Sequence, residues 1–502
     1  MMKELQHLKY RRQFLFSAQK CSDLEDWKHV GIGNHHLYVH QDCGLDRVKK
    51  NKLEIVLIGY ILSPNFPEKS TSQILENIAD CITIENITKY LYSASGRYVL
   101  IIKKDDDYIF LNDACGLRTF FYTKYNENIY AASQPLLLKL VLNIKEGKRY
   151  YEYYESEYVK STPEHWLPSG TSLYENVYHL VANHYLNSKT YEQVRYWPNK
   201  MIKKMSLDEG IEKLSYLLNN SMLAINNKLK LAITLTAGWD SRIVFSACKE
   251  ISNDIIVYTL KYRKLTEKSK DIWVPKKLLS KLGLKHQIID CKKPIDESFV
   301  KIYQENSDMS HLNDWGLIAN GMYYGGYPSE RIAVKGSCSE IGRLVYPDLA
   351  ELKPDVLTDQ SLMDIEFNKC NNIPFIKEQL FEWFNCINDE KVNYGYDILD
   401  LFYWEQKMNS WQGQSQLEWD IVQDTFTPFN NREIIDIMLA VKPEYRVKPN
   451  YVLFTKVMEK LWKEVLEVPI NPKSTSFKIR FYLRKNLLNM GKFRDIKKVF
   501  RK

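Results

Sequence analysis

The sequence predicts a mixed fold, both α/β and α+β, with a β-rich layered N-terminal domain and a doubly wound parallel sheet with extra helices in the C-terminal domain. Residues 1–140 contain short runs rich in Ile, Val, Tyr and Phe that are separated by turn signals. From Ser206 onward, apolar strand patterns alternate with helical patterns, which is typical of a parallel sheet. From about Leu312 the chain reads as mostly helical and is rich in Trp and Tyr.

Strands of the first part are expected where these β-rich runs occur, at residues 51–62, 96–104, 107–113, 119–123 and 128–133. The acidic triplet Asp105 to Asp107 lies between two of them and predicts a hairpin loop. A bridging stretch with a turn at Pro168 and Gly170 follows and is expected to end near Pro198.

The second part is expected to begin at Ser206, which together with Glu209 has the pattern of a helix capping box. Apolar residues then recur at helical spacing, at Ile211, Leu214, Leu217, Leu218 and Met222. Strands are expected at 229–235, 255–260 and 285–290, with helices at 241–250 and 271–284. The sequence therefore predicts domains at residues 1–200 and 201–477, followed by a basic tail at 478–502.

Composition excludes several classes of protein. Hydrophobic residues make up 45% and charged residues 26% of the 502 residues, which is not typical of disordered, collagenous or coiled-coil chains. The nine cysteines are scattered and form no CxxC pair, as expected for reduced thiols. Because no signal peptide pattern and no apolar run of membrane-spanning length is found, we expect a cytoplasmic protein.

The strongest local signal is the segment Thr236-Ala237-Gly238-Trp239-Asp240-Ser241-Arg242, which follows an expected strand and opens an expected helix. Backbone N–H groups at such a turn form an anion site, to which Thr236 and Ser241 add hydroxyl donors. The Asp240 carboxylate could hold Mg²⁺, which commonly accompanies bound polyphosphate. Alternatively, Asp240 and Ser241 only cap the helix.

This segment resembles the pyrophosphate loop SGGxDS of the asparagine synthetase-like, PP-loop ATP pyrophosphatase family. Other features of that family follow in the same order: an acid that heads a helix, a histidine, a second glycine-rich loop, an acid before a PFLDRRL-like segment, and a lysine after a Pro-containing turn. The matching positions are Asp271, His286, Lys335-Gly336-Ser337-Cys338-Ser339-Glu340, Asp424 before Pro428, and Lys473.

The front half is similar to the class II glutamine amidotransferase domain of the same family. This similarity rests on Gly59, Gly96-Arg97-Tyr98, Asp113, Gly116, Arg118 and Ser133. The family's glutaminase uses an N-terminal cysteine nucleophile, whereas this chain begins Met1-Met2-Lys3 and its first cysteine is Cys21. We therefore expect no glutamine hydrolysis and a structural or docking role for the front domain.

The resemblance implies a Mg²⁺- and ATP-dependent ligase that activates a carboxylate as an acyl-adenylate and joins it to ammonia or to a substrate amine. It places the phosphates on Thr236, Ala237, Gly238, Asp240, Ser241, Gly336 and Ser337. It implies that Asp240 and Glu340 bind Mg²⁺ and that Asp424 steers or deprotonates the amine. It also implies that Lys473 stabilises the charge that develops on phosphate or on the tetrahedral intermediate. Plainer roles are a turn cap for Asp424, a solvated side chain for Lys473 and a helix-terminal acid for Glu340.

The second loop departs from the family pattern, because Ser337 and Cys338 replace Glu-Gly. Since Asp240 and Glu340 both remain acidic, this favours a changed substrate over a lost ATP site. The implied carboxylate substrate is a small molecule, a peptide or a glycan precursor. A non-catalytic scaffold with decayed sites and a PP-loop enzyme that modifies nucleic acid are the alternatives.

The basic charge is concentrated in the tail. Residues 478–502 carry a net charge of +9, whereas the whole chain carries +8, so the body is close to neutral. A near-neutral body argues against a groove that follows nucleic-acid phosphates. Apolar residues interleave with the basic ones in the tail, which is typical either of a helix on an anionic membrane surface or of a terminal helix that packs on the protein.

Overall fold

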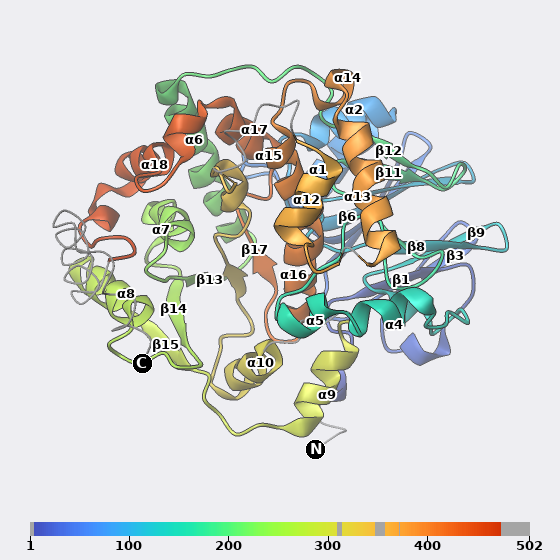
Figure 1. Cartoon of the computed structure of the whole chain (residues 1–502), viewed down its shortest axis with the longest axis horizontal. Coiled ribbons are helices and arrows are strands. Elements are labelled where there is room, and N and C mark those ends of the chain that lie inside the picture. The colour runs from blue at the N-terminus through green and yellow to red at the C-terminus, as the bar shows by residue number, and fades with distance from the viewer. Residues whose placement is uncertain (1–4, 309–313, 347–356, 371, 473–502) are drawn as a thin grey trace, which may run out of the picture.

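The computed structural model describes residues 5–308, 314–346, 357–370 and 372–472. Lys473 and the basic tail 478–502 lie outside these ranges. Two six-stranded antiparallel sheets occupy the N-terminal part, and one five-stranded parallel sheet lies in the C-terminal part (Figure 1). The predicted fold class is therefore confirmed.

The two antiparallel sheets pack face to face. Large apolar residues from both sheets, among them Phe16, Val56, Ile101 and Phe110, form the buried layer between them. The first sheet has the order β10 (Tyr178–His179), β8 (Phe121–Tyr125), β9 (Asn128–Ala132), β1 (Phe14–Ser17), β3 (His35–Val39) and β2 (Lys28–Ile32). The second has the order β12 (Gln193–Arg195), β11 (His184–Asn187), β7 (Asp107–Asn112), β6 (Ser95–Lys104), β5 (Leu53–Leu62) and β4 (Leu45–Lys50).

The acidic hairpin between β6 and β7 is confirmed. Lys104 pairs with Asp107, and Asp105 takes a positive φ of 53° at the turn, a conformation that Asp tolerates better than most residues. Asp107 itself belongs to β7 rather than to the loop. The stretch expected to be only a bridge, before Pro198, instead supplies β10, β11 and β12, which complete both sheets.

Two helices in the front part had not been expected, α1 (Thr71–Asp80) and α2 (Ile84–Leu91). Ser70 and Thr83 cap their N-termini by accepting hydrogen bonds from backbone amides three residues later. Their apolar residues pack with Leu57, Leu100 and other residues of the outer face of the second sheet. Because the period-2 runs dominate this region, the two short helical patterns were overlooked.

The parallel sheet has the order β15 (Gln287–Asp290), β14 (Ile256–Lys261), β13 (Leu231–Thr234), β16 (Ile332–Val334) and β17 (Thr425–Phe426). Alternate residues enter different cores: Ile233 and Val334 lie in the core that contains α6 and α7, whereas Ala232 and Ala333 lie in the core that contains α9 and α10. Both faces are thus covered by helices, as the doubly wound prediction requires.

Three helices follow the parallel strands along the chain. They are α7 (Trp239–Ser246) after β13, α8 (Lys270–Lys281) after β14 and α9 (Glu297–Glu305) after β15. Before the sheet, α6 (Leu207–Asn226) has Ser206 as its N-cap, whose hydroxyl accepts the Glu209 amide at 3.2 Å. This is one half of the expected capping box; the Glu209 carboxylate instead accepts from Lys213 Nζ at 2.8 Å.

The remaining helices fill the space around and between the sheets (Figure 1). Before α6 these are α3 (Pro135–Leu138), α4 (Lys148–Tyr154) and α5 (Glu157–Ser161). After α9 they are α10 (Trp315–Tyr324), α12 (Asp359–Glu366), α13 (Pro374–Ile387), α14 (Glu390–Asn393), α15 (Ile398–Phe402), a π-helical segment (Tyr403–Gln412), α16 (Gly413–Trp419), α17 (Arg432–Ala440) and α18 (Val452–Trp462). Over the described ranges, no helix is both long enough and apolar enough to cross a bilayer.

Candidate functional site

The site lies at the carboxyl edge of the parallel sheet. β13 occupies the middle: the chain continues from it to β14 and β15 on one side, whereas β16 and β17 lie on the other. The boundary between β13 and β16 is therefore a topological switch point, where open parallel sheets bind their ligands. The loops that leave these two strands contain all the predicted phosphate-binding residues, at 236–241 and at 336–337.

The first loop is held by its own side chains. The Ser241 hydroxyl lies 3.0 Å from the Thr236 hydroxyl and accepts the Thr236 amide at 3.1 Å, while the Gly238 amide donates to Thr236 Oγ1 at 3.2 Å. The Ala237 amide donates to Asp271 Oδ1 at 3.1 Å. The two hydroxyls predicted to meet phosphate thus also fix the shape of the loop.

Helix α7 begins directly at this loop, with Gly238 as N-cap. No side chain caps this N-terminus. The alternative in which Asp240 and Ser241 only cap this helix does not hold: Ser241 accepts the Thr236 amide, and the Asp240 carboxylate is directed to the second loop. An uncapped helix N-terminus carries partial positive charge and suits an anion.

The second loop touches the first through its backbone. A methyl group placed on Gly336 would lie 2.4 Å from the carbonyl carbon of Asp240, so only glycine fits at this position. Ser339 Oγ donates to Asp240 Oδ1 at 2.6 Å. Cys338 adopts a left-handed backbone with φ 69°, and its thiol is buried. These contacts bring Glu340 toward Asp240.

Asp240, Glu340 and Arg343 form a small charged cluster. Arg343 Nη2 lies 3.1 Å from Asp240 Oδ1 and 3.7 Å from Glu340 Oε1. Burial, together with the negative charge of Asp240, raises the pKa of Glu340 to about 8. The Asp240 and Glu340 side chains remain 31% and 23% exposed, so a ligand can reach them.

These two carboxylates suit a cation that is held jointly with phosphate. Throughout the described ranges, no group of three or more His, Cys, Asp or Glu side chains could hold a metal ion. Mg²⁺ commonly binds through only one or two carboxylates together with substrate phosphates and water. Of the two carboxylate oxygens of Glu340, Oε2 is buried and has no hydrogen-bond partner among the described residues.

Aromatic side chains line the same cluster. The Arg343 guanidinium lies 5.5 Å from the ring centroid of Tyr451, and Trp239 meets that ring edge-on at 5.3 Å. On the other side, Thr427 Oγ1 donates to the Ser337 carbonyl at 2.6 Å, which attaches the segment after β17 to the second loop. The site is therefore assembled from three consecutive strand ends of the sheet.

Asp424 lies at the opposite end of β17. Strand β17 begins at Thr425, which pairs with Ala333 of β16, so Asp424 precedes the strand rather than following it. The guanidinium groups of Arg118, Arg97 and Arg12 outweigh burial and hold the pKa of Asp424 below its usual value. A carboxylate with a lowered pKa is a weak base, so this environment favours a charge-pairing role over proton abstraction.

The segment before Lys473 reaches the first loop. The Asn471 amide donates to the Ala237 carbonyl at 2.8 Å, and Lys270 Nζ donates to Asn471 Oδ1 at 3.0 Å. Lys473 itself lies outside the described residues. His286 Nε2 lies 2.8 Å from Thr259 Oγ1.

Sequence reasoning missed Arg343, Ser339 as a partner of Asp240, and Thr427. Arg343 follows Glu340 at a spacing of three residues, which is a recognisable signal for an ion pair in a helical turn. Thr427 carries no such signal, because its partner is a backbone carbonyl 90 residues away.

Comparison of the chain with protein-family models and with curated proteins finds no match. Among solved structures, it has a likeness to glutamine phosphoribosylpyrophosphate amidotransferase from B. subtilis complexed with ADP and GMP, at 13% identity and a TM-score of 0.23, over 57% of this chain and 67% of that chain. A second likeness, to an allosteric regulatory enzyme of purine biosynthesis, has 14% identity and a TM-score of 0.24, over 57% of this chain and 70% of that chain. At such low TM-scores neither likeness supports an argument about function.

Proposed function

We propose that this chain is an asparagine synthetase-like, Mg²⁺- and ATP-dependent ligase that forms a carbon–nitrogen bond through an acyl-adenylate. The observation that carries the proposal is the meeting of the two loops at the switch point. There the uncapped N-terminus of α7 lies beside two carboxylates, Asp240 and Glu340. Helix amides can bind phosphate, and the carboxylates can bind the accompanying cation.

In the proposed reaction, a substrate carboxylate attacks the α-phosphorus of ATP and pyrophosphate leaves. Ammonia or a substrate amine then attacks the acyl carbon, and AMP leaves as the amide forms. The N-terminal amides of α7, together with the Thr236 and Ser241 hydroxyls, would hold the pyrophosphate. Bound Mg²⁺ would neutralise part of the phosphate charge. Arg343 and Ser339 would keep the Asp240 carboxylate oriented toward that charge.

The predicted role of Asp424 changes within this proposal. Because three arginines keep it ionised and it precedes β17, we assign it to the contact between the two halves of the protein rather than to the amine. Lys473 would stabilise the negative charge that develops during transfer, as the resemblance implies. The acyl substrate is a small molecule, a peptide or a glycan precursor.

The proposal can be tested by ATP–pyrophosphate exchange in the presence of Mg²⁺, with fractions of small molecules and peptides from the host as acyl donors. Asp240→Asn is the test variant. Asp254→Asn, which changes an exposed carboxylate whose side chain is not part of the site, is the matched control. Exchange that depends on one fraction and is lost only in Asp240→Asn would support adenylation.

Two outcomes would count against the ligase. Exchange that survives in Asp240→Asn would remove this carboxylate from the site. Absence of both exchange and Mg·ATP binding in folded wild-type protein would instead favour the scaffold alternative.

A further inference from the structure

A strongly basic surface lies at one edge of the parallel sheet. Residues 261–293 run from the last residue of β14 through α8 and β15, and they contain eleven basic and three acidic side chains, a net charge of +8. We define the basic face as the exposed surface of these residues. β15 is an edge strand, whereas β17 at the other edge contacts β6 of the front half (Figure 1). The basic face is therefore directed away from the contact between the two halves.

Most of the positive charge on the basic face has no carboxylate partner. Three of the eleven basic side chains pair with acids, at distances between 2.5 and 3.0 Å. Six others are exposed and form no ion pair with any described residue. These six are Lys264, Lys268, Lys276, Lys277, Lys285 and Lys293.

The lysines of α8 lie on the solvent side of that helix. Lys270, Lys277 and Lys281 follow one another at spacings of seven and four residues, which places them on one side. The buried residues of α8 occupy the other side. The half-buried Trp273 lies among the lysines, with Lys276 and Lys277 three and four residues after it. Aromatic and basic side chains on one helix face are typical of helices at a membrane interface.

The described part of the chain ends beside this helix. Lys281 Nζ lies 3.0 Å from Glu467 Oε2, and Lys270 Nζ donates to Asn471 Oδ1 at 3.0 Å. The tail 478–502, with its net charge of +9, therefore begins within a few residues of the basic face. Because the whole chain carries +8, the residues outside the basic face and the tail carry −9 in total.

Two observations disfavour packing of the tail on the basic face. Both carry positive charge, and like charges repel. The apolar residues of the tail would also need an apolar surface to cover. None of the large apolar side chains that the described chain exposes belongs to the basic face or to residues 432–472, which lead to the tail. An external partner with negative charge suits both segments better.

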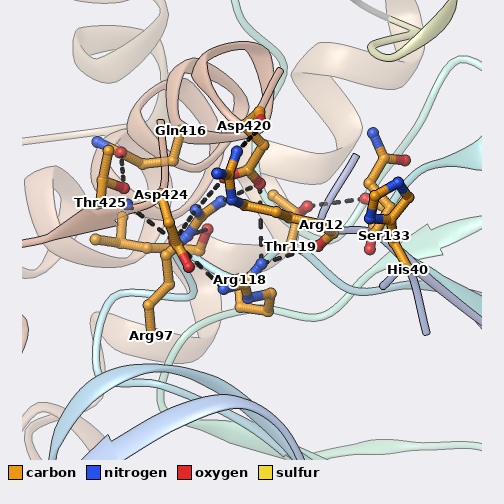
Figure 2. A network of polar contacts seen from close by, with 12 residues as sticks. Arg12, His40, Arg97, Arg118, Thr119, Ser133, Gln416, Asp420, Asp424 and Thr425 are labelled. Carbon is orange, nitrogen blue, oxygen red and sulfur yellow. Dashed lines mark hydrogen bonds and ion pairs between the residues drawn. The ribbon is translucent and has the colours of Figure 1, made fainter. Parts of the chain in front are cut away.

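Other groups of basic side chains do not offer such a surface. Arg12, Arg97 and Arg118 are buried and converge on Asp420 and Asp424 in the interior (Figure 2). At the turn between β4 and β5, two lysines pair with acids at 2.8 and 3.5 Å. The basic face differs from both groups because its lysines are exposed and mostly unpaired.

We propose that the basic face and the tail together bind the surface of an anionic lipid bilayer. A planar anionic surface can meet the exposed lysines and the tail at the same time. The apolar residues that interleave with the basic ones of the tail favour a bilayer over nucleic acid, because they can enter the boundary between headgroups and acyl chains. Binding would hold the loop at 236–241 close to the bilayer, since Ala237 contacts both Asp271 of α8 and Asn471.

The test measures co-sedimentation of the full-length protein with two kinds of vesicle. One kind contains phosphatidylcholine alone, and the other contains equal parts of phosphatidylcholine and phosphatidylglycerol. We expect binding to the anionic vesicles only, and we expect it to weaken as the salt concentration rises, because exposed charges are screened. Equal binding to both kinds of vesicle, or binding to neither, would overturn the proposal. No enzymatic activity is needed, so the outcome is independent of the proposed function.

The test variant combines Lys268→Gln, Lys276→Gln and Lys277→Gln. Each basic residue near an anionic leaflet contributes about a fivefold factor to partitioning, so this variant should bind anionic vesicles roughly a hundredfold more weakly. The three substitutions are at exposed positions, and the folded structure should persist.

The matched control combines Lys20→Gln, Lys104→Gln and Lys189→Gln. It removes the same charge from exposed lysines of the front half and should bind anionic vesicles as the wild type does. Equal weakening in the two triple variants would show that attraction follows the net charge alone, and it would overturn the role of the basic face.

Two further arms separate the tail and the kind of partner. Deletion of residues 478–502 should weaken vesicle binding further than the test variant does, because it removes more charge and the apolar residues as well. Unaltered binding after this deletion would overturn the joint role of face and tail. Binding of the full-length protein to a DNA duplex under conditions in which it does not bind the anionic vesicles would assign the basic face to nucleic acid and would also overturn the proposal.

Discussion

The backbone of Gly336 lies directly against the backbone of Asp240. A Cβ atom added to Gly336 would approach both the carbonyl carbon and the carbonyl oxygen of Asp240 to 2.4 Å. Since Glu340 follows in the same loop, this contact sets how closely the two carboxylates of the candidate site approach each other. The packing of two loops, 96 positions apart in the sequence, therefore determines the proposed cation site.

Gly336→Ala is expected to push the two loops apart. Overpacking of this kind costs on the order of 1–3 kcal/mol of stability, and we expect Mg·ATP binding to be lost in protein that remains folded. Gly31→Ala is the matched control, because a Cβ at Gly31 meets no atom within 4 Å. Calorimetric titration with Mg·ATP checks the result, and unaltered affinity in Gly336→Ala would contradict it.

Ser339→Ala should weaken Mg·ATP binding without abolishing it. The variant removes the 2.6 Å hydrogen bond to Asp240 but leaves Arg343 as the remaining partner. A hydrogen bond to a charged group contributes about 1.5 kcal/mol or more, which corresponds to roughly a tenfold increase in Kd. Ser252→Ala, at a surface hydroxyl that bonds only a local carbonyl, should leave Kd unchanged. An equal Kd in both variants would show that Ser339 does not orient Asp240.

Arg97→Met should destabilise the whole protein. It leaves Asp420 buried without its bidentate partner, and removing one member of a buried ion pair costs about 3–5 kcal/mol. The double variant Arg97→Met, Asp420→Asn should recover part of that loss, because the uncompensated carboxylate is then gone. Urea unfolding of the three proteins measures both effects, and an additive double variant would show that the two residues do not interact.

Stability should fall as the pH decreases from about 6.5 towards 4. Burial lowers the pKa of His179 to about 3, and burial with help from Arg195 lowers the pKa of His184 to about 4. The unfolded chain therefore binds protons at these positions before the folded chain does, so the stability that they contribute is present above pH 6.5 and is lost below it. At pH 5, each of these two histidines should lower the free energy of unfolding by about 2 kcal/mol relative to pH 7.

His179→Phe tests the histidine prediction directly. The imidazole stacks on Phe121 with a centroid distance of 4.5 Å, and a phenyl ring can keep that contact. The variant should show a smaller loss of unfolding free energy between pH 7 and pH 5 in urea titrations. An identical loss in wild type and variant would assign the acid sensitivity to other groups.

Local patterns in the sequence were sufficient for most of the strands. The alternating runs that became β5, β6 and β7, and the apolar run that became β13, have periodicities that follow from burial of one or both faces of a sheet. The helices α1 and α2 were missed because they are short patterns within a region dominated by strands. The strands β10 to β12 were missed because two to four residues carry too little periodicity to be recognised.

The sequence by itself determined the residues of the candidate site, because Asp240 and Glu340 stand in short motifs next to strands whose pattern is local. Tertiary structure decided what surrounds them. The sheet order placed β16 beside β13, which brought the two motifs together and added Arg343 and Thr427. The docking of the front sheet surrounded Asp424 with Arg12, Arg97 and Arg118 and thereby lowered its pKa. Such contacts join residues hundreds of positions apart, and no local pattern encodes them, because their energies arise only when the chain is folded.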